Sequence, residues 1–221
     1  MKNTDLLKEI EQLKIEGFNS RDEITNEKRK EYYPVLEQVA NIFIQKLQPV
    51  RIPIDVGRII DLFGVSVTVS DMSRFSEVDN SDKDKSQNVN IHALIGVFKD
   101  KNNNFQATIN VNSADESELN RLGILYCLGL YLFDYKQGEE YFNGCATYDD
   151  KDESDYNTVI RFACNTFAYS VLMPREEFSQ IDLLLRNKGL SNDERIRELA
   201  KIFNVRDFDV KKRLLLLEFC C

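Results

Sequence analysis

The spacing of apolar residues predicts two helices in the first part of the chain. The stretch TDLLKEIEQLKIE has apolar residues at helical intervals behind a threonine, a residue type that caps helices, and predicts an amphipathic helix from Thr4 to about Glu16. A second amphipathic helix is predicted to open at Pro34, because proline is tolerated in the first helical turn, and to end before Pro49. The charged stretch RDEITNEKRK separates the two.

Runs of β-branched residues predict a small sheet in the middle of the chain. Ile54 and Asp55 begin a short predicted helix that ends near Gly64 and leads into a strand, Val65 to Val69. The runs HALIGVF and FQATINV predict a hairpin, because the intervening KDKNNN supplies Asn and Asp residues that tolerate turns. The polar stretch from Ser73 to Asn90 is predicted to be a mobile surface loop.

The second half of the chain is predicted to be mainly helical. Ser113 and Glu116 have the spacing of a capping box, so a helix is expected to start just after the hairpin. This helix is apolar nearly all round, which places it at the centre of the fold. Another helix is predicted from Tyr156 to Leu172, and two more close the chain, with Ser191–Glu194 and Asp207 as their caps.

Composition and charge indicate what class of protein this is and which partners it can bind. Hydrophobic residues make up 43% of the 221 residues and charged residues 30%, which is typical of a soluble globular protein with a real core. The net charge of −8 argues against direct DNA binding, and Lys211, Lys212 and Arg213 are interpreted as the solvated face of the last helix. The absence of a signal-peptide pattern or a bilayer-spanning apolar run predicts a cytoplasmic protein without membrane contact. Five cysteines without a C-x-x-C pair favour reduced thiols.

The chain contains, in this order, the segments ATINVNSADESELNRLGIL, YCLGL (Tyr126 to Leu130) and ACNTFAYSVLMPREEF. Together these three segments resemble the ImmA/IrrE family of zinc metallopeptidases. ATINVNSADESELNRLGIL resembles the family's strand and capped lead-in to its active-site helix. In that helix the family carries His-Glu-Leu-Gly-His, where this chain has Tyr126-Cys127-Leu128-Gly129-Leu130. ACNTFAYSVLMPREEF is similar to the family's Glu-Ala-Asn-x-Phe-Ala-x-x-Leu-Leu-Met-Pro segment. The resemblance extends from about Val35 to Leu217.

The patterns and the resemblance together predict an α+β fold. We expect a mostly helical, zincin-like body that carries a small sheet of about three strands. Residues 31–221 are expected to form a degenerate ImmA/IrrE-like domain with C-terminal helices, and residues 1–30 a helical N-terminal extension.

The chemistry of the family's motif shows what this chain lacks. Two histidines one helical turn apart bind zinc, the glutamate activates the metal-bound water, and a third ligand comes from a second helix. The resemblance assigns the histidine positions to Tyr126 and Leu130, the general base to Cys127 and the third ligand to Ala163. The only histidine of the chain is His92, so a two-histidine site cannot be built. We expect no metal and no other cofactor, with Tyr126 and Leu130 filling the space of the lost site.

The remaining polar residues leave other chemistry open. Cys127, Cys145, Cys164 and His92 could form a thiolate-rich zinc site, although structural zinc sites usually contain close ligand pairs and this chain has none. Cys127 could be a nucleophile with His92 as its base, although a cysteine in an apolar helix is more often a small buried hydrophobe. The acidic stretch YDDKDESDY could hold a hard cation, although such runs usually face water.

Two hypotheses about function follow from the resemblance, which implies bacterial or mobile-element enzymes that cleave helix-turn-helix repressors. The first is a catalytically inactive pseudo-peptidase that regulates genes by binding a repressor, a toxin or antitoxin protein, or another copy of itself. Its expected groove lies between the hairpin and the active-site helix, where the hairpin strand accepts an extended peptide. The candidate groove residues are His92, Leu94, Gly96, Phe98 and Tyr126. The second hypothesis is a hydrolase with a rebuilt thiol or acidic active site.

Overall fold

Seven helices and one four-stranded sheet make up the described part of the chain. The computed structural model describes residues 10, 13, 17–72, 89–148 and 158–218. The predicted helix from Thr4 to Glu16 lies outside these residues except for positions 10 and 13, and so does the acidic stretch after Tyr148. Of the predicted loop from Ser73 to Asn90, residues 73–88 lie outside the described part, and the last two residues belong to a strand instead. In chain order the elements are α2 (Asn26–Lys46), α3 (Val56–Phe63), β1 (Ser66–Ser70), β2 (Val89–Lys99), β3 (Phe105–Asn112), α4 (Ser117–Phe133), β4 (Tyr141–Tyr148), α5 (Val159–Leu172), α6 (Arg175–Asn187), α7 (Asn192–Phe203) and α8 (Asp207–Leu217).

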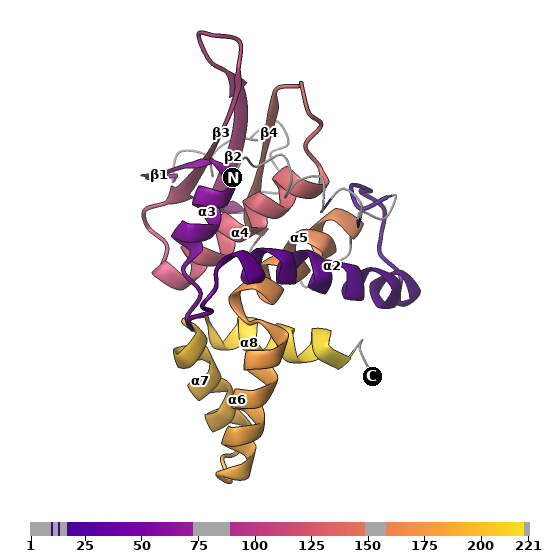
Figure 1. Ribbon diagram of the computed structural model, residues 1–221, viewed down its shortest axis with the longest axis vertical. Helices are drawn as coiled ribbons and strands as arrows, with labels where there is room; N and C mark the ends of the chain where they lie inside the picture. The colour runs from indigo at the N-terminus through magenta and orange to yellow at the C-terminus, as the bar shows by residue number, and fades with distance from the viewer. Residues whose placement is uncertain (1–9, 11–12, 14–16, 73–88, 149–157, 219–221) are drawn as a thin grey trace, which may run out of the picture.

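The sheet lies at one end of the molecule and the pair α6 and α7 at the other (Figure 1). Its strand order is β1-β3-β2-β4, with β1 parallel to β3 and the other neighbours antiparallel. Alternate residues of β2, namely Ala93, Ile95 and Val97, are almost fully buried on the face that packs against α4. The expected hairpin is confirmed as β2 and β3, whereas the edge strand β4 is an addition to the three strands expected from the sequence.

The core below the sheet is a stack of α4, α5 and α2, with α5 in the middle. The ring of Phe167 on α5 meets Phe43 of α2 and Phe133 of α4 edge-on, with centroids 5.6 and 6.0 Å apart. Edge-to-face packing of this kind suits buried aromatic rings. Both α4 and α5 are buried almost all round, so the expectation of a central apolar helix is confirmed and applies to two helices.

Several helix ends confirm the sequence analysis and others correct it. Asp55 caps α3 by accepting hydrogen bonds from the amides of Gly57 and Arg58, and α7 has the predicted capping box of Ser191 and Glu194. Helix α4 begins at Ser117, however, so Ser113 does not cap it. The N-cap of α8 is the residue before Asp207, and α6, which was not predicted, follows directly after Pro174.

Helix α2 begins eight residues before the predicted start at Pro34. Thr25 caps it by accepting a hydrogen bond from the Lys28 amide, and Pro34 lies within the helix. The added turns are held by tertiary contacts, because Tyr32 and Tyr33 are buried in the core and the Arg29 guanidinium stacks 5.5 Å from the centre of the Phe162 ring. The predicted boundary after residue 30 therefore falls inside a continuous helix.

A buried ion pair joins α8 to α2 and corrects the interpretation of Arg213. Its side chain is 0% exposed and its guanidinium binds the carboxylate of Glu37 on α2, while its Nε donates to the carbonyl of Met173 at 3.0 Å. The guanidinium also donates to the hydroxyls of Tyr33 and Ser170, each at 3.0 Å. Burial alone would raise the pKa of Glu37, but the charge and hydrogen bonds of Arg213 and its neighbours hold that pKa below its usual range. Of the three basic residues, Lys211 is exposed and Arg213 is part of the core.

Candidate functional site

The segment that resembles an active-site helix is the part of α4 that packs most closely on α5. Gly129 makes this approach possible, because a Cβ added there would lie 3.0 Å from the Cα and 3.2 Å from the Sγ of Cys164. These distances are shorter than ordinary van der Waals contacts, so a side chain at this position would require the helices to move apart. The retained glycine therefore brings the two helices together at the point where the family's metal ligands would stand.

The four positions that the resemblance assigns to the family's catalytic residues are all buried. Tyr126 is 7% exposed, Leu130 1%, and both Cys127 and Ala163 0%, and all four belong to the single hydrophobic core cluster. Close packing of this kind agrees with the expectation that apolar and aromatic groups occupy the space of the lost site. Leu130 and Ala163 have no atom that could bind a metal or transfer a proton.

The hydroxyl and thiols around these positions are held in their neutral forms. Burial raises the pKa of Tyr126 strongly, and nearby Cys164 and Cys145 raise it further. Burial also raises the pKa of Cys127 and of Cys164 well above the usual range, and raises that of Cys145 on β4 to about 12. Since a thiolate is the reactive and metal-binding form of cysteine, these thiols have the character of buried hydrophobes. The description of Cys127 as a small buried hydrophobe is confirmed.

His92 lies on β2 at a bulge in its pairing with β4, and it bonds to the start of α4. Its Nδ1 is 2.8 Å from the Oδ2 of Asp115, and its side chain is 8% exposed. Asp115 precedes α4 in the connection from β3, so this contact fixes the hairpin against the helix. Among the described residues no three of His, Cys, Asp and Glu come together in a way that could hold a metal ion.

The candidate groove residues are divided between the two faces of the sheet. Leu94, Gly96 and Phe98 alternate with the buried residues of β2 and so lie on the face away from α4, where Phe98 is 50% exposed and its ring lies over Gly96. Tyr126 is on α4, against the other face. The helix packs directly on the sheet, because a Cβ on Gly123 would lie 3.0 Å from the Cβ of Ala93.

Strand addition to the segment from His92 to Phe98 is excluded by the sheet topology. Strand β2 pairs with β3 on one side and with β4 on the other, so both of its edges are occupied. The prediction of a peptide-binding edge on this strand is therefore wrong. The edge of the sheet on this side is β4, which the sequence analysis did not recognise as a strand.

A comparison with known protein families identifies the family of this chain. The sequence profile of the IrrE N-terminal-like domain, a peptidase family, matches residues 74–215. The chain belongs to this family. The match covers the hairpin, the helix α4 and the segment ACNTFAYSVLMPREEF, which are the parts that carry the resemblance in the sequence.

Comparisons with curated proteins and with solved structures do not add to this family assignment. No curated protein matches the chain. A solved structure described as a Mycobacterium tuberculosis transcriptional regulator is similar, with 16% sequence identity and a TM-score of 0.48 over 95% of this chain and 51% of that one. The chain thus spans about half the length of that protein. None of the helices in the described ranges is both long enough and apolar enough to cross a bilayer.

The zinc ion of active IrrE-like peptidases does not fit the residues of this domain. A catalytic zinc takes three protein ligands of the His, Asp, Glu or Cys type and keeps a position open for water. Here Leu130 and Ala163 offer no donor, and Tyr126 is a buried phenol whose raised pKa keeps its proton on. The general-base position holds the thiol of Cys127, which is 0% exposed and out of reach of a water molecule.

Proposed function

We propose that this IrrE-like domain is a pseudo-peptidase, which regulates gene expression by binding a protein without cleaving it. The observation that carries the proposal is the burial of Tyr126, Cys127, Leu130 and Ala163 in the hydrophobic core, at the positions of the family's ligands and base. Peptide hydrolysis of the zincin type needs a polarised water in an open site, and this core has neither the ligands nor the space for one.

The edge strand β4 is the part of the sheet best suited to a partner. Its sequence YFNGCATY has no charged residue and no proline, which are two of the devices that keep edge strands from pairing with other chains. Phe142 on β4 is 63% exposed and lies opposite Gly96, next to the exposed Phe98. An extended segment of a repressor or a toxin–antitoxin protein would hydrogen-bond to the backbone of β4, and its side chains would rest on these two rings.

Metal content and hydrolysis test the loss of catalysis. After incubation with zinc and removal of the excess, elemental mass spectrometry should find much less than one zinc per chain, and unfolded casein should stay intact with or without zinc. A hydrolase with a rebuilt site would instead cleave casein and lose this activity with a chelator or a thiol reagent. Stoichiometric zinc in the unmodified protein would overturn the proposal.

A gain-of-ligand variant provides the matched control for the residue assignment. Tyr126→His, Cys127→Glu, Leu130→His and Ala163→Glu together restore the family's ligands and base, so the variant should retain zinc. Ala163→Glu places a carboxylate at a fully buried position, so circular dichroism must first show that the variant is folded. A folded variant that takes up no zinc would contradict the assignment of these positions.

Photo-crosslinking tests the β4 edge as the partner site. The photoreactive analogue p-benzoylphenylalanine at Phe142 should crosslink to one defined protein in cells, because this side chain is exposed beside an edge of β4 that no described strand pairs with. The control position is Leu183 on α6, which is similarly exposed at 58% and lies at the other end of the molecule. The same products from both positions, or none from Phe142, would reject the β4 site.

A further inference from the structure

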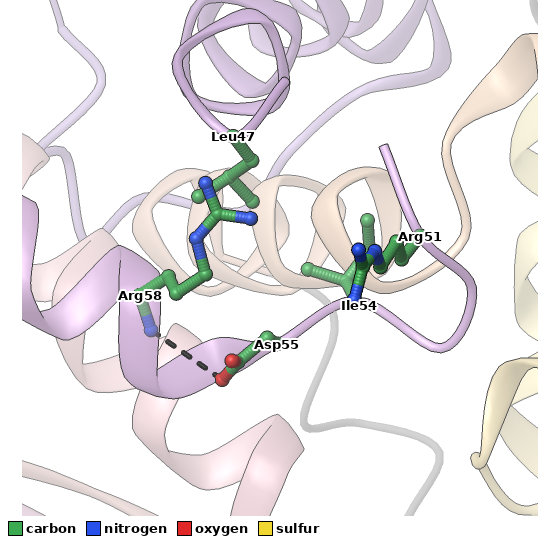
Figure 2. Close-up of a pocket in the computed structure, with 5 residues that line it drawn as sticks. All are labelled: Leu47, Arg51, Ile54, Asp55 and Arg58. Carbon is green, nitrogen blue, oxygen red and sulfur yellow. Dashed lines mark hydrogen bonds between the residues drawn. The ribbon is translucent and has the colours of Figure 1, made fainter. Parts of the chain in front are cut away.

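A small hollow lined by two arginines lies where α2 ends and α3 begins, away from the degenerate site. Its lining residues are Leu47, Arg51, Ile54, Asp55 and Arg58, and its volume is about 100 Å³. Figure 2 shows Arg58 extending from the first turn of α3 toward Leu47, with Arg51 beside Ile54 on the other side. Leu47 and Ile54 are 4% and 3% exposed, so the apolar part of the lining is anchored in the core.

The charges of the hollow are unbalanced in favour of the cations. The side chains of Arg51 and Arg58 are exposed, and neither forms an ion pair with any residue in the described ranges. The one carboxylate of the lining, Asp55, uses its Oδ1 to accept hydrogen bonds from the amides of Gly57 and Arg58 at 2.9 and 3.4 Å. The first amides of α3 are thereby already satisfied, and the two guanidiniums are the groups left to bind a ligand.

Hydrogen bonds from Arg121 hold the backbone segment that forms the base of the hollow. Arg121 on α4 donates from its guanidinium to the carbonyl of Ile54 at 2.8 Å and to the carbonyl of Phe203 at 3.1 Å. These bonds tie the segment that carries Arg51 and Asp55 to two other helices. Because this backbone segment is already held in place, binding a ligand costs little backbone entropy. The conformational entropy lost on binding is then mainly that of the two arginine side chains.

We propose that this hollow is a binding site for a phosphate group. Guanidinium groups bind phosphate oxygens through pairs of parallel hydrogen bonds, and two of them match the two negative charges of the group. A volume of 100 Å³ corresponds to roughly seven water-sized positions, against the five heavy atoms of a phosphate. The chain as a whole carries a net charge of −8, so anion binding on this protein depends on a local site of this type.

Calorimetric titration of the full chain with inorganic phosphate tests the site at low ionic strength. Saturable one-to-one binding is expected, and Arg51→Gln or Arg58→Gln should each weaken it about tenfold or more, because each removes charge-assisted hydrogen bonds. Asp55→Asn keeps a side chain that caps α3 but removes the negative charge, so it should strengthen phosphate binding roughly two- to fivefold.

Arg175→Gln is the matched control, because Arg175 is an exposed arginine in the first turn of another helix, α6. It changes the net charge equally and should leave phosphate affinity unchanged. A second titration with phosphoserine distinguishes the sources of the group: equal or tighter binding assigns the site to a phosphate ester, and weaker binding to free phosphate. No saturable binding, or equal losses in Arg175→Gln and the two site variants, would overturn the proposal.

Discussion

At the scale of single residues, the missing side chain of Gly129 decides how closely α4 and α5 approach. A Cβ at this position would lie 3.0 Å from the Cα of Cys164 and 3.2 Å from its Cβ and Sγ, and the neighbouring Ala163 is fully buried. In an active peptidase the same proximity serves to bring ligands from two helices to one metal ion. In this chain the positions that the resemblance assigns to those ligands are buried core residues, which agrees with the proposed loss of the metal site.

Substitution of Gly129 should therefore destabilise the fold by an amount that grows with side-chain size. Gly129→Ala gains about 1 kcal/mol of helix propensity, which offsets part of the overpacking, whereas Gly129→Val should lose roughly 2 kcal/mol or more. Urea denaturation gives the change in the free energy of unfolding. Gly57→Ala in α3 is the control, because its nearest neighbour is the flexible carboxylate of Asp55 at 3.1 Å. A Gly129→Val variant as stable as the unmodified protein would refute the close contact.

At the scale of elements, the sequence predicts the helices and strands whose hydrophobic pattern agrees with the capping or turn residues at their ends. The helix α3 has both Asp55 at its start and a left-handed Gly64 at its end, and the hairpin has alternating β-branched strands around a polar turn. Strand β4 escapes prediction because YFNGCATY contains glycine and asparagine and has little β-branched character, so its strand form depends on pairing with β2. Helix α2 starts early for a similar reason: contacts of Tyr33 and Arg29 outweigh the helix-breaking tendency of Pro34.

Some features of the candidate site can likewise be predicted from the local sequence pattern, whereas others depend on the tertiary fold. The sequence assigns Tyr126, Cys127, Leu130 and Ala163 to the family's catalytic positions because they lie in segments with recognisable neighbours, and the structure shows that all four are buried. It does not reveal that His92 to Phe98 is an interior strand, since an interior position depends on where β4 returns to the sheet. Nor does it reveal the hollow beside α3, because its two arginines are brought together only by the end of α2.

At the scale of the whole molecule, the ion pair of Arg213 and Glu37 connects the first and last described helices through α5. The two residues are 176 positions apart, and Ser170 of α5 donates a hydrogen bond to the same carboxylate. Basic side chains of an amphipathic helix normally lie on its solvated face, and for this reason the sequence predicts Arg213 to be on the surface. Its burial is explained by the full set of partners, which satisfies both charges inside the core.

Breaking this pair should cost much more than removing a surface charge from the same helix. Arg213→Met leaves the Glu37 carboxylate buried without its cation, so the free energy of unfolding should fall by about 3–5 kcal/mol. Lys211→Met, on the exposed face of α8, should change it by less than about 0.5 kcal/mol. Urea denaturation at neutral pH measures both, and similar values for the two variants would contradict the buried pair.

The pH dependence of the same pair has a definite sign. The pKa of Glu37 is lower in the folded protein than its usual value, so its contribution to stability is present above the unfolded pKa and is lost as the pH falls through the lower, folded value. In Arg213→Met the cation is gone and burial raises the pKa of Glu37 instead, so the stability difference from the unmodified protein should be largest above that raised pKa and should shrink as the pH falls. Urea denaturation of both proteins at a series of pH values measures this, and a difference that grows in acid would contradict it.

The long separation of Glu37 and Arg213 also bears on how the protein is made. On the ribosome, the acid of α2 is synthesised 176 residues before the cation that neutralises it. Until that cation has emerged, burial of Glu37 against α5 would leave a carboxylate in an apolar core without a counter-charge. Closing the core around Glu37 before α8 has been synthesised therefore carries this energetic cost, and Arg213 removes the cost once α8 has emerged.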